Sequence, residues 1–113
     1  MEFSCTARQS TDRVVLTVTG DVDLAAHARF EADVDQAWDG TTDLVIDCSG
    51  VEFLDSMGLR VLVQCRQVAV DNGREFALAG PSEAVVRVLE LAGVRSLFSV
   101  VEAVPDAEAD PAS

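Results

Sequence analysis

Short apolar runs alternate along this chain with segments of helical periodicity. Val14, Leu16 and Val18 share one face of an extended segment, whereas the run at 44–46 is apolar on both faces, as in a strand inside a parallel sheet. Between these runs, apolar residues recur at the spacing of an amphipathic helix. The pattern predicts strands over residues 2–8, 14–19, 43–48, 75–79 and 97–101, and helices over 24–38, 56–70 and 81–92.

The order of these elements is strand, strand, helix, strand, helix, strand, helix, strand, which predicts an α/β fold. Helical crossovers make the strands that they join parallel, and the opening pair of strands makes the sheet mixed. Local signals set the expected ends of the elements. We expect Gly20 to end the second strand, Asp23 to cap the first helix, Ser49-Gly50 to form a turn, and Pro81 to stand near the first position of the third helix.

The chain is strongly acidic. Its 113 residues include 20 acids and 8 bases, all of them arginine, for a net charge of −12. A surface of this sign repels phosphate backbones and anionic lipids, so we expect no binding to nucleic acid or to membranes. The sequence has no apolar run of membrane-spanning length and no signal peptide, so we expect a cytoplasmic protein.

One domain accounts for nearly all of this length. We assign residues 1–102 to the domain and interpret 103–113 as a disordered acidic tail, because that segment is small, charged and contains proline. Four of the net twelve negative charges lie at Glu102, Asp106, Glu108 and Asp110, so residues 1–101 retain a net charge of −8.

Cysteine and histidine are too sparse to predict a metal or catalytic site. Cys5, Cys48 and Cys65 are far apart in the sequence, and His27 is the only histidine. We interpret the cysteines as small buried hydrophobes in a reducing compartment. A serine nucleophile needs a base within reach, and a chain without lysine has no lysine chemistry. We therefore expect no enzyme activity, no cofactor and no metal.

One segment carries most of the functional information. Residues 44–59 read Leu-Val-Ile-Asp-Cys-Ser-Gly-Val-Glu-Phe-Leu-Asp-Ser-Met-Gly-Leu, a buried strand that leads into the start of a helix. If Asp55 caps this helix, Ser56 takes the first helical position with its hydroxyl pointing outward. Gly58 removes a side chain at a place where another group can approach closely. By spacing alone, an ordinary capped helix with a serine in its first turn explains the segment at least as well.

Over residues 2–101 the sequence resembles the STAS domain family and, within it, the bacterial anti-sigma-factor antagonists. The resemblance rests on Gly-Asp-Val-Asp at 20–23, the buried strand at 44–47, Phe-Leu-Asp-Ser-Met-Gly-Leu at 53–59, Ala-Gly-Pro-Ser at 79–82 and Leu-Ala-Gly-Val at 91–94. It implies a single STAS domain, a small mixed sheet with helices packed mainly on one face. Members of this family are switches rather than enzymes.

The resemblance also implies a role for Ser56. In the antagonists, the serine after the motif aspartate is phosphorylated by an anti-sigma factor that is also a serine kinase. The unphosphorylated antagonist binds the anti-sigma factor and releases the sigma factor; phosphorylation ends this binding, and a phosphatase acting on phospho-Ser56 restores it. In the family, an aspartate of the first turn lies near this serine, and it corresponds to Asp23. We predict that the partner-binding residues are Asp23, Asp55, Ser56, Met57, Gly58 and Arg60.

Two positions depart from the family's pattern. Many antagonists have Ser or Thr where Met57 stands, and a small residue is common where Arg60 stands. For Met57 a partner contact and a place in the core are both open, and for Arg60 a partner contact and a solvated position. We expect a monomer. Two other functions remain as alternatives: a STAS subunit of another assembly, such as a stressosome-like scaffold or the accessory subunit of a lipid transporter, and a structural or small-ligand-binding module.

Overall fold

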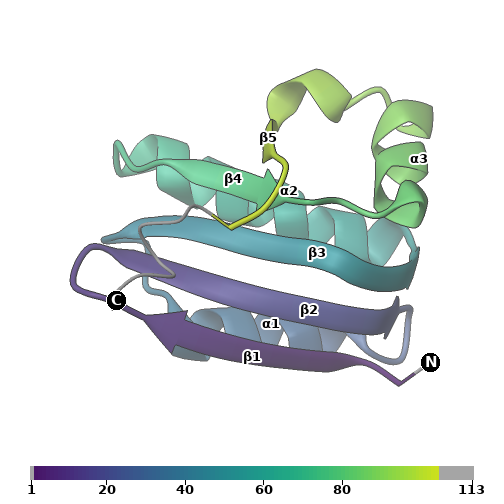
Figure 1. The fold of residues 1–113 in the computed structure, drawn as a ribbon, viewed down its shortest axis with the longest axis horizontal. Coiled ribbons are helices and arrows are strands. Elements are labelled where there is room, and N and C mark those ends of the chain that lie inside the picture. The colour runs from purple at the N-terminus through teal and green to yellow at the C-terminus, as the bar shows by residue number, and fades with distance from the viewer. Residues whose placement is uncertain (1, 105–113) are drawn as a thin grey trace.

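The computed structural model describes residues 2–104, which form a five-stranded sheet with helices packed against it (Figure 1). The strands lie side by side in chain order, from β1 to β5. β1 pairs with β2 in antiparallel orientation, and each later pair is parallel, so the predicted mixed α/β fold is confirmed. The strands are Ser4–Gln9 (β1), Arg13–Val22 (β2), Asp43–Leu54 (β3), Phe76–Ala79 (β4) and Ser99–Val101 (β5).

The helices lie mainly on one side of the sheet (Figure 1). Each crossover moves one strand further in the same direction, and because such connections share one handedness, their helices fall on the same face. None of the helices between residues 2 and 104 has both the length and the apolar character needed to cross a membrane. The helices are His27–Ala37 (α1), Ser56–Asp71 (α2), Glu83–Leu91 (α3) and the short 3-10 helix Arg95–Leu97 (η1).

The main core lies between the sheet and the helices. Side chains alternate along β2, so Val14, Leu16 and Val18 all point toward the helices and are 5% exposed or less. From the helix layer, Phe30 of α1 and Leu62 of α2 pack into the same cluster. Each such side chain contributes about 1.5–3 kcal/mol to folding by leaving water, which is what holds the helices on the sheet.

A smaller apolar cluster lies on the opposite face of the sheet. Val15, Val45 and Ala79, from three neighbouring strands, are its buried members. Val101 and Val104 pack against them, so the chain that follows β5 covers part of this face (Figure 1). Val104 of the expected tail therefore packs on the sheet and Ala103 is exposed, whereas residues 105–113 lie outside the described part of the protein.

Two expected strand ends are wrong. β2 continues through Gly20 to Val22, and β3 continues through Ser49-Gly50 to Leu54. The two strands remain paired over this length, with register shifts between Thr17 and Thr19 and between Gly20 and Asp21. Such irregularities let a ladder resume after an unpaired residue. Gly20 adopts a φ of 86°, which costs glycine no strain, and it stays paired with Val51, so β2 continues through it.

The remaining boundary differences have local causes. Regular helix α1 begins at His27, because Asp23 caps a preceding turn, accepting a hydrogen bond from the N–H of Ala26 at 3.0 Å. Ser82 caps α3, so Pro81 stands before the cap rather than inside the helix. β5 begins at Ser99, because the chain before it forms η1.

The three cysteines are free thiols, and two of them are buried as expected. Cys48 faces the main core from β3 and Cys65 faces it from α2, whereas Cys5 is half-buried at the edge strand β1. Burial raises the pKa of Cys48 and of Cys65 to about 12, and that of Cys5 to about 11. In the folded protein all three thiols therefore stay protonated at neutral pH.

We expect the folded protein at pH 8 to react with a thiol reagent at least tenfold more slowly than the urea-unfolded chain, because the thiolate is the reactive form. A folded Cys5→Ser variant, which keeps only the two buried thiols, should react more slowly than the folded wild-type protein. The unfolded chain loses its thiol protons near pH 9, whereas the folded protein keeps those of Cys48 and Cys65 up to about pH 12. The contribution of these thiols to the free energy of unfolding is therefore fully present below pH 9 and is lost as the pH rises toward 12. Equal labelling rates for folded and unfolded protein would contradict this prediction.

Candidate functional site

The candidate site lies where the parallel strands β2 and β3 end together. Their last residues, Val22 and Leu54, are paired in the sheet, and the N–H of Asp55 then donates to the carbonyl of Val22 at 3.1 Å. This bond joins the end of β2 to Asp55, the residue directly before α2. Loops at the carboxyl ends of parallel strands are where α/β proteins commonly place their binding residues.

Asp55 caps α2 as predicted. Its backbone is extended, and its Oδ1 accepts hydrogen bonds from the N–H groups of Met57 and Gly58, each at 3.0 Å. One carboxylate oxygen thus satisfies two of the amides that a helix N-terminus leaves without a partner inside the helix. The cap sets the position of the first helical turn, including its first residue, Ser56.

Ser56 is the first residue of α2, and its side chain is exposed. Within residues 2–104 its hydroxyl takes part in neither the cap nor any other hydrogen bond. The prediction that Asp55 caps the helix and leaves the Ser56 hydroxyl free therefore holds in the structure. An anion attached at this position would meet the positive end of the helix dipole.

Asp23 reaches the same end of the molecule from the other loop. Val22 and Asp55 are joined by the hydrogen bond described above. Asp23 directly follows Val22, and Ser56 directly follows Asp55, so the two residues lie next to this bond. The Asp23 carboxylate is engaged with the N–H of Ala26, and its carbonyl accepts from His27. The two sequence-predicted residues are therefore brought into adjacent loops, with Asp23 held by its own turn.

Gly58 is buried, and the space beside it is filled from within the chain. A Cβ placed on Gly58 would lie 2.6 Å from Cδ1 of Leu54 and 2.7 Å from Cγ1 of Val22. The groups that approach Gly58 closely are therefore side chains of β2 and β3, which pack against the first turn of α2. Any influence of Gly58 on a partner would be exerted through the position of this turn.

Met57 and Arg60 differ in their surroundings. Met57 is half-buried in the first turn of α2, whereas Arg60 is exposed one turn later. Arg60 belongs to the outer stripe of α2, which also carries Gln64, Gln67 and Asp71, all exposed. Both side chains can be reached from solvent beside Ser56, so neither departure from the family's pattern disturbs the core.

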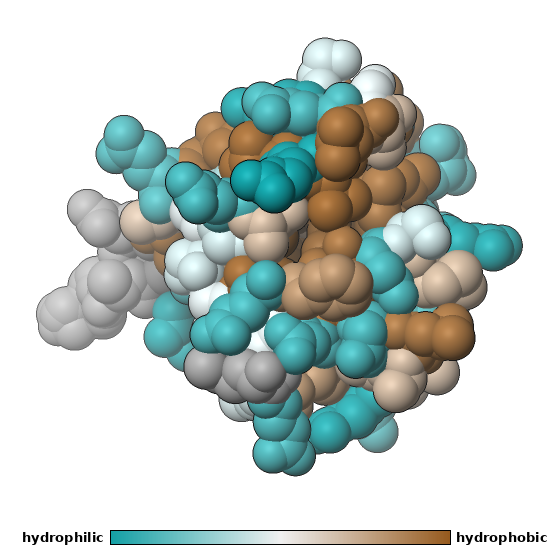
Figure 2. Space-filling model, turned by 90° about the vertical axis from the view of Figure 1, so that its right-hand side faces the viewer, coloured by the Kyte–Doolittle hydropathy of each residue, from teal (hydrophilic) through white to brown (hydrophobic). Residues whose placement is uncertain are grey.

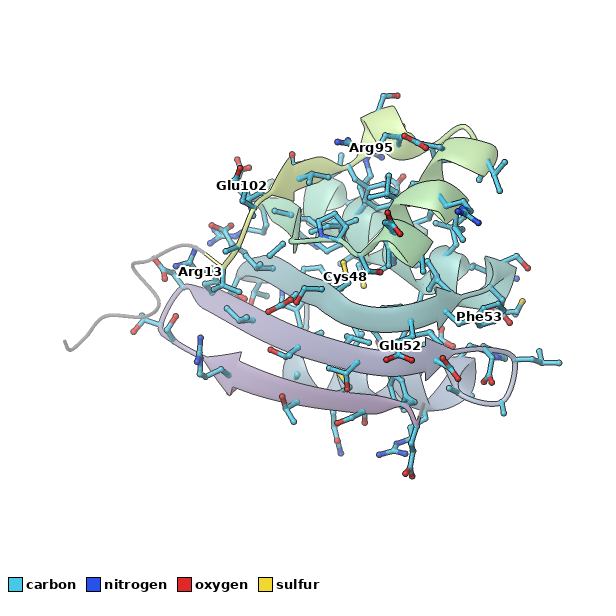
Figure 3. The ribbon with its side chains drawn as sticks, turned by 45° about the vertical axis from the view of Figure 1, so that its right-hand side comes forward. Arg13, Cys48, Glu52, Phe53, Arg95 and Glu102 are labelled. Carbon is cyan, nitrogen blue, oxygen red and sulfur yellow. The ribbon has the colours of Figure 1, made fainter. Side chains whose placement is uncertain are left out.

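Two large apolar side chains beside the site were not singled out by the sequence analysis. Leu24, just after Asp23, is 69% exposed, and Phe53, at the end of β3, is 49% exposed. Figure 3 shows Phe53 at the end of β3, with Glu52 on the face of the sheet turned to the viewer. In the sequence, Leu24 falls outside the apolar stripe of the first helix, and this was the one local indication that its side chain is exposed. Exposed apolar groups in one place are typical of protein-binding surfaces.

The whole end of the molecule has this mixed character. Figure 2 views it along the direction in which β2 and β3 run: hydrophobic side chains gather in its upper part, at the height of α3 in Figure 1, with hydrophilic ones among and around them. Such a surface is suited to a protein partner, because an apolar centre with a polar rim resembles known interfaces.

The site offers little for covalent catalysis or metal binding. His27 is the one histidine of the chain, and its Nδ1 lies 2.8 Å from the carbonyl of Leu24, so that nitrogen is engaged with the backbone. Between residues 2 and 104 there is no group of three His, Cys, Asp or Glu side chains arranged to hold a metal ion. What the site presents is an exposed hydroxyl, carboxylates in the two loops and apolar side chains.

Comparison with known proteins gives consistent matches. The family model for the STAS domain matches residues 4–107. The anti-sigma-F factor antagonist RsfB of Mycobacterium tuberculosis is 31% identical over 94 residues, which cover 82% of this chain and 76% of RsfB.

Solved structures share the fold. An anti-sigma factor antagonist from Mycobacterium paratuberculosis superposes with a TM-score of 0.81 at 24% identity, covering 96% of this chain and 92% of that one. The anti-sigma factor antagonist SpoIIAA in its unphosphorylated form gives a TM-score of 0.74 at 19% identity, covering 94% and 92%. The phosphorylated form of SpoIIAA, from Bacillus, gives 0.70 at 18% identity, covering 97% and 100%.

We expect a Gly58→Ala substitution to destabilise the protein by about 1–3 kcal/mol, because the new methyl group overpacks the contact with Val22 and Leu54. Helix propensity alone predicts the opposite sign, a gain of up to about 1 kcal/mol. Urea unfolding measures the difference. In a double-mutant cycle, Val22→Ala should relieve part of the overlap, so the double variant should lose less stability than the two single variants together. A stabilised Gly58→Ala protein would refute the close packing.

Proposed function

The chain belongs to the STAS domain family, among the anti-sigma factor antagonists, and from this premise we propose that it binds an anti-sigma factor and is switched off by phosphorylation of Ser56. The partner we propose is an anti-sigma factor with serine-kinase activity. Its capture by the unphosphorylated protein releases a sigma factor. The protein itself acts as a binding protein rather than an enzyme, in the cytoplasm and as a monomer.

The single observation that carries this proposal is the position of Ser56. The hydroxyl is exposed at the first residue of a capped helix, and the cap uses Asp55 rather than the serine. A kinase can therefore reach the hydroxyl without unfolding the helix. Transfer joins Oγ of Ser56 to the γ-phosphoryl group of ATP held by the partner, breaks the bond to ADP and releases the hydroxyl proton. A phosphatase reverses the modification by hydrolysis, which yields inorganic phosphate.

The expected effect of the phosphate is electrostatic. It adds about −1.5 to −2 charges at neutral pH. The N-terminus of α2 tolerates an anion, so the fold should persist. Asp55 lies directly before the modified residue, and Asp23 lies in the adjacent loop, so a partner surface that fits the neutral serine then meets concentrated negative charge. We propose that repulsion and desolvation at this contact, rather than refolding, release the partner.

The rest of the proposed partner surface surrounds Ser56. Met57, Arg60 and Asp23 are all reached from solvent beside it. Leu24 and Phe53 add exposed apolar area, 69% and 49% exposed, which a partner would bury. The solved forms of SpoIIAA, one unphosphorylated and one phosphorylated, share this fold and support a switch that leaves the domain folded.

Incubation with the cognate anti-sigma factor and labelled ATP should place one phosphate on the wild-type protein and none on Ser56→Ala. Ser49→Ala is the matched control: Ser49 lies on β3, is also exposed, and donates its hydroxyl to Asp47 at 2.8 Å. This control should be labelled like the wild type. Phosphate found by mass spectrometry at another residue, or labelling that survives in Ser56→Ala, would overturn the assignment of Ser56.

A Ser56→Asp variant should bind the anti-sigma factor at least tenfold more weakly than the wild type, which corresponds to about 1.4 kcal/mol. Ser56→Ala should bind like the unphosphorylated wild type, because it adds no charge. Calorimetric titration measures both, and circular dichroism should show the same folded content in all three proteins. Equal affinity of Ser56→Asp and wild type would contradict the switch. Copurification with transporter subunits instead of an anti-sigma factor would favour the alternative assembly.

A further inference from the structure

An open groove runs between α1 and α2, away from the loops that carry Ser56. It has a volume of about 550 Å³. Its floor is apolar. The floor is formed by Val34 of α1, by Trp38 at the C-cap of α1, and by Val61, Cys65 and Val68 of α2. Val68 remains 39% exposed, so the floor is open to solvent. No element between residues 2 and 104 covers it.

One wall of the groove is acidic. Glu31 and Asp35, which are one turn apart on α1, line it together with Asp39, which lies just beyond the C-cap residue Trp38. The facing wall carries the amides of Gln64 and Gln67, and among the described residues that line the groove none is basic. The negative charge of this wall also affects the floor. Burial first, and then the charges of Asp35 and Glu31, raise the pKa of the Cys65 thiol to about 12. The groove therefore combines an apolar floor with a uniformly negative wall.

The acidic wall and the apolar floor suit one side of an amphipathic helix. Glu31 and Asp35 are about 6 Å apart along the axis of α1, and Asp39 continues the wall past the end of that helix. An amphipathic helix presents apolar side chains at positions i, i+3 or i+4, and i+7 along one side. Arginine or lysine residues next to such a stripe would face the three carboxylates.

We propose that this groove binds a basic amphipathic helix of a protein partner, separately from the surface around Ser56. The apolar side of that helix packs on Trp38, Val61 and Val68, and its cations pair with Glu31, Asp35 and Asp39. The net charge of −12 favours approach of a basic partner and opposes anionic lipids. Val61 follows Ser56 by five residues, about 8 Å along α2, so both surfaces can be occupied by different segments.

The groove contains its own reporter. Trp38 is the single tryptophan of the chain, and it is 6% exposed on the floor of the groove. Its Nε1 donates to the carbonyl of Thr42 at 2.9 Å, which holds the indole in place. Occupation of the groove should therefore change the emission of one fixed indole.

The test uses the full chain and a synthetic, tryptophan-free helical peptide of about 15 residues, with leucines at i, i+3, i+4 and i+7 flanked by arginines. Titration should change Trp38 emission saturably. A Glu31→Gln/Asp35→Asn variant should raise the Kd at least tenfold. Glu83→Gln/Glu90→Gln is the matched control, because it removes two exposed charges from α3, outside the groove. It should change the Kd less than twofold.

Three results would overturn the proposal. The first is equal binding by a scrambled peptide of the same composition, which would indicate charge attraction alone. The second is an equal loss in the α3 control. The third is a peptide-free dimer that hides Trp38 in sedimentation and fluorescence measurements, which would make a second copy the occupant. Ser56→Asp should leave the peptide Kd within twofold of wild type, so failure of the switch and failure of the groove are separate outcomes.

Discussion

The pairing of β2 with β3 is the constraint on which the rest of the molecule depends. These central strands stay in register through two irregularities and end side by side, so the loops that follow them meet at one place. The bond from the N–H of Asp55 to the carbonyl of Val22 closes this junction. It sets where α2 starts, and with it the direction in which Ser56 faces. Gly58 completes the junction, because only a residue without a side chain lets α2 approach β2 so closely.

This junction separates the stability of the helix start from its chemistry. Asp55 caps the helix and Gly58 packs against the strands. The side chain of Ser56, which lies between them, takes part in neither interaction. The phosphate proposed for Ser56 would therefore cost the fold little. The carboxylate of Asp23 is held by its own turn, so the added charge would act mainly on a partner that contacts this surface. The proposed switch changes affinity rather than shape.

The excess acid of the chain is distributed over functionally different places. Asp23 and Asp55 stand in the loops around Ser56, where we propose that phosphorylation adds negative charge. Glu31, Asp35 and Asp39 line the groove between α1 and α2, where a standing negative charge selects a basic partner. In these proposals the first set makes affinity depend on phosphorylation of Ser56, whereas the second set acts without it. In the two proposals, the kinase therefore acts at one end of the domain while a second protein binds along its helices.

Local sequence was sufficient for the alternation of strands and helices, the cap at Asp55, the outward Ser56 and the mixed sheet, because hydrophobic periodicity and capping act over a few residues. The order and spacing of the segments at 20–23, 44–47, 53–59, 79–82 and 91–94 together were enough to indicate the family. Only the tertiary structure decided that Gly20 and Gly50 continue their strands, since a neighbouring strand supplies the hydrogen bonds that a local turn would otherwise need. It likewise decided that Gly58 packs against Val22, that Leu24 and Phe53 remain exposed, and that α1 and α2 leave a groove between them. Each of these depends on contacts between residues far apart in the chain, and no local pattern encodes such distances.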